Sequence, residues 1–253
     1  MIVAGFMLLA VGAVDLVRQF APRRWIGYLV VTVVLLLLGS VSDALLPMLI
    51  ALVVGALWIW TMPDGRSARL GFWPAVLLAL ASIGSVVWLG GRADAGLIGD
   101  AWTLRSPFGD VSFDLAVLAL GAGVFLLESA NLVVRAALDG EHTWRPIELV
   151  PAAEKSGDEE PDTGVAEASA PRGGFKGGRL IGPLERILVL ILTLAAAYPI
   201  LAAMLAAKGI VRFPEISRDG ETGARAEYFL VGSLVSWVMA LGAAFLVWWA
   251  AHS

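Results

Sequence analysis

Long apolar runs without a formal charge constrain this chain most. Five of them approach or exceed the roughly 20 residues that a helix needs to cross a bilayer: Trp25–Ser42, Ala44–Pro63, Leu70–Gly91, Ile187–Ala207 and Tyr228–Ala251. Composition agrees, since 58% of the 253 residues are hydrophobic and 16% are charged, whereas soluble domains average about 45–50% and about 25%. The chain is therefore predicted to be an all-α integral membrane protein without a sizeable soluble domain.

Two further runs contain acidic residues. Ile2–Phe20 includes Asp15, and Phe113–Val134 includes Asp114 and Glu128. Together the runs predict about seven transmembrane helices, or six if Pro199 breaks the sixth segment and makes it re-entrant. The five-helix region would cover residues 1–147, a disordered acidic linker residues 148–178, and a two-helix region residues 179–253.

Lysine and arginine in short loops predict the orientation. Arginines follow the first and third spans, and the hairpin between the second and third spans has none. This pattern places the N-terminus outside and the linker in the cytoplasm, and seven spans place the C-terminus there too. The Ala/Gly/Val/Arg-rich composition points to a bacterium with a high GC content, and the expected location is the bacterial inner membrane. One group disagrees with the rule, because a complete sixth crossing would put Lys208, Arg212, Arg218 and Arg225 outside.

Several function classes are excluded or disfavoured by residue content. The net charge is −4 and no basic stripe is present, which argues against nucleic-acid binding. The chain has no cysteine and two histidines, so we expect no cofactor and no metal site. The motifs of intramembrane proteases, P-loops and zinc hydrolases are absent, so no catalytic residue is assigned, although an enzyme stays open.

Charged side chains inside spans are costly and mark candidate sites. Asp15 and Arg18 are expected to form an interfacial ion pair, and Asp43 to cap the third helix. Glu128, Asn131 and Arg135 would share one helix face in the fifth span. They serve either as polar glue between helices or as a proton or cation site.

The sixth segment carries a second set of charges. Glu185, with Pro183, is expected in the first turn of the helix, where it complements the helix dipole. Arg186 has no such local role and requires lipid phosphate, an acidic neighbour or a ligand. Lys208 and Arg212 would share a projecting face that is solvated, contacts anionic lipid or binds an anionic partner.

Three polar motifs in the C-terminal third carry a family resemblance. They are G-R-L-I-G-P-L-E-R from Gly178, A-A-K-G-I-V-R-F-P-E-I from Ala206, and A-E-Y-F-L-V-G-S-L-V-S from Ala226. This part resembles a group of bacterial polytopic membrane proteins without an established activity. Gly209, Ser233 and Pro183 depart from the pattern, and the N-terminal half does not match. The resemblance implies that eight residues matter: Glu185, Arg186, Lys208, Arg212, Phe213, Glu215, Glu227 and Tyr228.

Two functions follow from these observations. The first is a structural or interaction subunit of a membrane complex, with a protein partner in the bilayer, because small residues recur at helix-packing spacing, as in Gly232/Ser236 and Ala240/Ala244. The alternative is a small transporter or channel that uses Glu128 and Asn131. One acidic residue near mid-span is little for ion coupling, so the subunit is the preferred hypothesis.

Overall fold

The structure is a computed structural model that describes residues 1–62, 71–92, 95–106, 109–140, 178–217 and 224–253. This part forms ten α-helices and a two-residue antiparallel hairpin, β1 (Arg105–Ser106) with β2 (Gly109–Asp110). The helices are α1 (Ile2–Phe20), α2 (Arg24–Val41), α3 (Leu45–Thr61), α4 (Trp73–Leu89), α5 (Gly96–Ala101), α6 (Phe113–Leu127), α7 (Ser129–Gly140), α8 (Gly178–Leu194), α9 (Tyr198–Ser217) and α10 (Ala224–His252). The predicted all-α fold is confirmed, since the only strands among the described residues are the two of this short hairpin. The predicted linker lies almost wholly outside the described residues.

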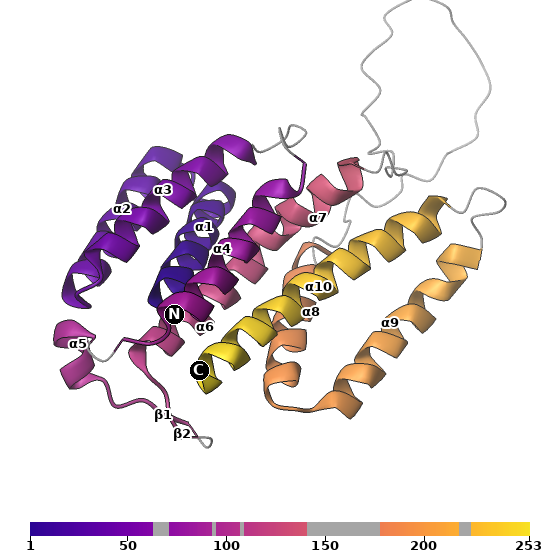
Figure 1. Ribbon diagram of the computed structural model, residues 1–253. Helices are drawn as coiled ribbons and strands as arrows, with labels where there is room; N and C mark the ends of the chain where they lie inside the picture. The colour runs from indigo at the N-terminus through magenta and orange to yellow at the C-terminus, as the bar shows by residue number, and fades with distance from the viewer. Residues whose placement is uncertain (63–70, 93–94, 107–108, 141–177, 218–223) are drawn as a thin grey trace, which may run out of the picture.

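Helix α1 is the centre of the N-terminal bundle, and α3, α4 and α6 pack around it (Figure 1). Its contact with α6 depends on glycine. A Cβ added at Gly5 would lie 2.9 Å from the backbone nitrogen of Leu118, and one at Gly12 would lie 2.8 Å from that of Phe125. A Cβ at Gly121 would collide with the carbonyl oxygen of Gly5. The two backbones therefore touch, as small residues permit in membrane helices.

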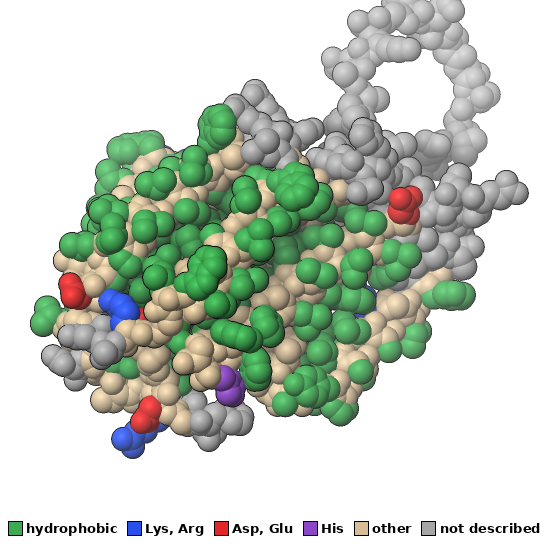
Figure 2. Space-filling view, in the orientation of Figure 1, with side chains coloured by type: hydrophobic (Ala, Val, Ile, Leu, Met, Phe, Trp, Pro, Cys, Tyr) green, Lys and Arg blue, Asp and Glu red, His purple; other side chains and the backbone are tan. Residues whose placement is uncertain are grey.

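Helix lengths do not support seven spans. Three described helices are long and apolar enough to cross a membrane: α1, α2 and the Phe229–His252 part of α10. Helices α6 and α7 would make a fourth span if their bent pair counts as one. Helices α3 and α4 have 17 residues each, or about 26 Å at standard rise, against a hydrocarbon core of about 30 Å. The surface is nevertheless compatible with a membrane location, since hydrophobic side chains spread across the face in Figure 2.

The fifth and sixth segments are not single straight helices. The fifth bends by 48° at Glu128, which ends α6. The sixth, expected as one helix over Ile187–Ala207, stops at Leu194 and restarts at Tyr198. Ala196 takes a left-handed φ of 54° in the turn, and the Ala197 amide donates to the Leu192 carbonyl as in a Schellman motif. Pro199 then sits in the first turn of α9, where its missing N–H costs little.

Helices α8 and α9 consequently form a hairpin, and α9 returns toward the end of the bundle from which α8 began (Figure 1). Helix α10 starts at that same end, because a Cβ at Gly232 would lie 3.7 Å from the side chain of Leu138 near the end of α7. The C-terminus therefore lies at the opposite end, beside the N-terminus. The predicted orientation, which put the linker and the C-terminus on one side, counted α8 and α9 as one crossing, and it stays a prediction.

At the N-terminal end of the bundle, Arg92 connects three segments. Its guanidinium contacts both carboxylate oxygens of Asp114, at 2.8 and 3.2 Å, and the carbonyl oxygens of Ser42 and Asp43, at 2.9 and 3.1 Å. Asp43 does not cap α3. It occupies a left-handed turn with φ 51°, and Ala44 is the N-cap residue. The burial of Asp114 in the first turn of α6 is thus explained by its arginine partner.

Candidate functional site

Five helices, α6 to α10, meet at a cluster of polar side chains that we call the α8 joint: Glu128, Asn131, Glu185, Arg186, Lys208, Ser236 and Trp237. Arg186 lies at its centre and is 2% exposed. The joint exists because the fifth segment breaks. The last carbonyls of α6 have no partner within the helix there, and a buried carbonyl left unpaired is costly.

Arg186 supplies donors at this break. Its Nε donates to the carbonyl oxygen of Leu126 at 2.8 Å, and its Nη2 reaches that of Leu127 at 3.5 Å. Nη2 also donates to Asn131 Oδ1 at 2.6 Å, and Nη1 to Ser236 Oγ at 3.4 Å. One guanidinium therefore joins α8 to α6, α7 and α10. Its fixed fork of donors suits this arrangement in a way that a lysine ammonium would not.

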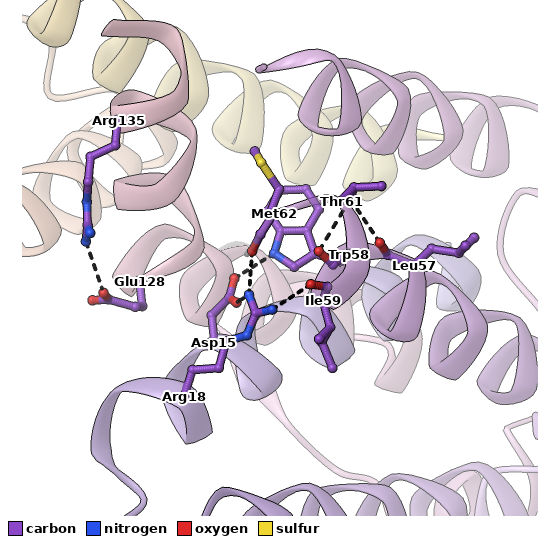
Figure 3. A network of polar contacts seen from close by, with 9 residues as sticks. All are labelled: Asp15, Arg18, Leu57, Trp58, Ile59, Thr61, Met62, Glu128 and Arg135. Carbon is purple, nitrogen blue, oxygen red and sulfur yellow. Dashed lines mark hydrogen bonds and ion pairs between the residues drawn. The ribbon is translucent and has the colours of Figure 1, made fainter. Parts of the chain in front are cut away.

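Glu128 lies beside this group. Its Oε2 accepts from Asn131 Nδ2 at 3.2 Å, and its Oε1 lies 3.8 Å from Arg135 Nη2 (Figure 3). Glu128, Asn131 and Arg135 thus approach one another as their spacing predicts, although they flank a helix break. The side chain of Glu128 is 10% exposed and that of Arg135 60%. Glu128 also contributes a favourable charge near Arg186.

Glu185 belongs to the other half of the joint. Both of its carboxylate oxygens lie 2.7 Å from Lys208 Nζ, and its Oε1 accepts from Trp237 Nε1 at 3.0 Å. The Lys208 ammonium also lies 5.4 Å from the ring centre of Trp237 and 5.8 Å from that of Phe229. Because α8 begins at Gly178, Glu185 stands in the middle of that helix, so its expected role at a helix N-terminus is wrong.

Of the remaining predicted residues, those with described side chains do not join this cluster. Phe213 and Glu227 are exposed. Arg212, Glu215 and Tyr228 lie on α9 and α10, but their side chains are outside the described residues. The contacts therefore bring together five of the eleven candidates, with Arg135 at the edge through Glu128: Glu128, Asn131, Glu185, Arg186 and Lys208.

A second buried polar group ties α1 to α3 (Figure 3). Arg18 Nη1 lies 3.1 Å from Asp15 Oδ1, and its other donors reach the carbonyl oxygens of Ile59 and Met62, each at 2.8 Å. Trp58 Nε1 donates to Asp15 Oδ2 at 2.8 Å. The predicted ion pair is present, but Asp15 is only 1% exposed. The pair is therefore a buried clamp on the C-terminal end of α3, and its depth at the membrane interface stays a prediction.

Trp58 and Trp237 contribute to the two clusters although neither is among the residues that the sequence singles out. Both residues lie well inside apolar segments. An indole N–H buried among apolar side chains needs an acceptor, so a mid-span tryptophan signals a nearby carboxylate or carbonyl. Both tryptophans indeed donate to carboxylates.

The charged side chains of the α8 joint bond to one another and to neighbouring polar groups, and its described residues form no cluster of metal ligands. No group of three or more acidic or histidine side chains suited to a metal ion occurs within the described ranges. No family model matches the chain, and no curated protein or solved structure is similar to it. The resemblance in the C-terminal third accordingly stays a prediction.

Proposed function

We propose that this protein is a subunit of a bacterial inner-membrane complex that binds a protein partner in the bilayer through α9. The observation that carries the proposal is the exposure of small residues on that helix. Ala202, Ala203, Ala206 and Ala207 are all exposed, and they form two overlapping pairs at the four-residue spacing of close helix packing. Helix α9 lies at the edge of the molecule (Figure 1).

The small-residue pairs noted in α10 do not serve this purpose. Ala240 and Ala244 are both 0% exposed, so they pack inside the chain. Helix α9 itself contacts the rest of the molecule through one stripe that includes Leu201, Met204 and Lys208. Its other faces are free to pack against a second transmembrane helix.

The first test is native mass spectrometry of the tagged protein, gently extracted from its own membranes. We expect a stoichiometric foreign subunit that is lost in Ala206→Trp. Ala81→Trp is the matched control, because Ala81 is exposed on α4, away from α9. A bare monomer or a homo-oligomer from the native membrane would contradict the proposal, as would loss of the partner in both variants.

The transporter is the second candidate, and the break at Glu128 favours it. Transporters place acidic groups at discontinuous helices near the midplane. If the purified protein catalyses cation or proton flux in proteoliposomes, and Glu128→Gln abolishes that flux while Arg135→Gln does not, the subunit proposal is wrong.

We also propose a membrane topology of six crossings, in which α3 and α4 count as short spans and α8 and α9 form a re-entrant hairpin. Lys208, Arg212, Arg218 and Arg225 then face the linker side, which agrees with the rule for basic residues. Arg172 and Lys176 precede α8 in the chain and Arg179 is its second residue, so this topology puts all three near anionic lipid on that side.

Because the chain has no native cysteine, single-cysteine labelling has a clean background. Ser156→Cys, between α7 and α8, should react only from the cytoplasm, and Ser253→Cys only from outside. If both cysteines react from the same side of the membrane, the six-crossing topology is wrong and an odd number of crossings is correct.

A further inference from the structure

We propose that a cavity between α4 and α10 holds one acyl chain of a membrane phospholipid. The cavity measures about 610 Å³, within the range of about 300–1,000 Å³ typical of small-molecule sites. Leu8 of α1 and Ala122 and Phe125 of α6 line its base, and Val133 and Ala137 of α7 extend the lining. The proposal rests on the membrane location and goes beyond the partner binding proposed above.

The shape of the cavity suits a chain rather than a compact ligand. Its lining runs from Phe72 to Ile83 along α4 and from Val231 to Leu246 along α10. These stretches correspond to about 16 Å and about 22 Å of helix. The lining residues Ile83, Leu234 and Val238 are exposed, so the cavity opens on the molecular surface. In a bilayer this surface faces acyl chains that run along the helices.

The chemistry of the lining excludes water as the usual occupant. Ser82 is the one residue with a side-chain hydrogen-bonding group among those that line the cavity, and its hydroxyl has no hydrogen-bond partner among the described residues. A bound water needs 2–4 polar partners, whereas apolar cavities stay dry. An empty space of this size forfeits dispersion contacts on every wall. A hydrocarbon chain supplies those contacts and needs no hydrogen-bond partner.

Gly242 offers a way to fill the cavity. It lines the cavity, and a Cβ added there would meet no atom within 4 Å. Gly242→Leu therefore places a side chain in the space that the acyl chain would occupy. Gly123→Leu is the matched control, since a Cβ at Gly123 also meets nothing within 4 Å and Gly123 does not line the cavity.

The test uses the purified full chain in proteoliposomes of phosphatidylethanolamine and phosphatidylglycerol, with a trace of phosphatidylglycerol carrying a diazirine on one acyl chain. After illumination, cross-linked residues are mapped by mass spectrometry. We expect adducts concentrated on cavity residues of α4 and α10. These adducts should fall several-fold in Gly242→Leu and stay unchanged in Gly123→Leu.

The exposed face of α2, with Leu29, Val33 and Leu37, reports ordinary contact with lipid. Labelling of α2 equal to that of the cavity, or cavity labelling unaffected by Gly242→Leu, would overturn the acyl-chain site. Absence of label on α2 would overturn the membrane location on which the site depends. If a diazirine fatty acid labels the cavity and the phospholipid does not, the phospholipid source is wrong. The cross-linking test uses the purified chain alone, so its outcome does not depend on whether the protein partner proposed above exists.

Discussion

The N-terminal bundle and the C-terminal helices are held together in different ways. Helices α1 and α6 meet backbone to backbone through Gly5, Gly12 and Gly121. Helices α8 and α10 also pack on the bundle through buried apolar residues such as Val189 and Ala240, but they add polar side chains centred on Arg186, and a cavity lies between α10 and α4. Backbone contact therefore distinguishes the first interface, and buried hydrogen bonds and charge distinguish the second. A change in volume should therefore damage the first, and a change in polarity the second.

The largest effect is expected for Gly121→Leu. Its Cβ would collide with the Gly5 carbonyl, and backbone atoms cannot move aside as a side-chain end can. We expect a loss of about 3 kcal/mol or more in the free energy of unfolding, measured by denaturant unfolding in mild detergent. Gly242→Leu should be neutral or stabilising by up to about 1 kcal/mol, because leucine favours helix more than glycine does. Equal losses in both variants would remove the contrast between the interfaces.

Arg186→Met should have the next largest effect. It leaves the carbonyl of Leu126 and Asn131 Oδ1 without their donor, whereas the carbonyl of Leu127 keeps Asn131 Nδ2, and the expected cost is about 2–3 kcal/mol. Arg135→Met removes an exposed arginine from the same region and should change stability by less than about 0.5 kcal/mol. A mild effect of Arg186→Met in the same unfolding assay would mean that the α8 joint does not hold these helices together.

Lys208 and Glu185 should show coupling in a double-mutant cycle. Lys208→Met leaves a largely buried carboxylate with Trp237 as a neutral donor, and we expect a loss of about 1–2 kcal/mol. Adding Glu185→Gln should recover part of that loss, because the unpaired charge is then gone. Additive losses would indicate that the two side chains do not interact in the folded protein.

The smallest effect, and one of opposite sign, is expected in the turn between α8 and α9. Ala196 holds a left-handed backbone that costs an L-residue roughly 1 kcal/mol and costs glycine little. Ala196→Gly should therefore raise the midpoint of thermal unfolding slightly. A fall in that midpoint would argue that the hairpin turn is not formed as described.

Local patterns were sufficient to predict much of the fold. Backbone polar groups in a bilayer must be hydrogen-bonded within the protein, so a long, mainly apolar run is expected to form a helix. The runs Ile2–Phe20 and Trp25–Ser42 accordingly became α1 and α2 within a residue or two at either end. The approach of Glu128, Asn131 and Arg135 also followed from their spacing, since residues three and four apart are neighbours on a helix.

The break in the sixth segment shows where local pattern reaches its limit. The presence of Pro199 was compatible with either a continuous or a broken sixth segment. The structure shows that the segment breaks and that α9 turns back. The turn brings the C-terminus to the same end of the molecule as the N-terminus. It also brings Lys208 into contact with Glu185.

The sequence by itself determined that the chain is helical, that it suits a bilayer, and which charges need an explanation. Tertiary structure alone decided their partners. Arg186 reaches a carbonyl 60 residues away, and Trp58 reaches a carboxylate 43 residues away. No local periodicity specifies such pairs. They form because desolvation makes an unpaired buried polar group costly, and the packing of whole helices determines which donor is close enough to satisfy each acceptor.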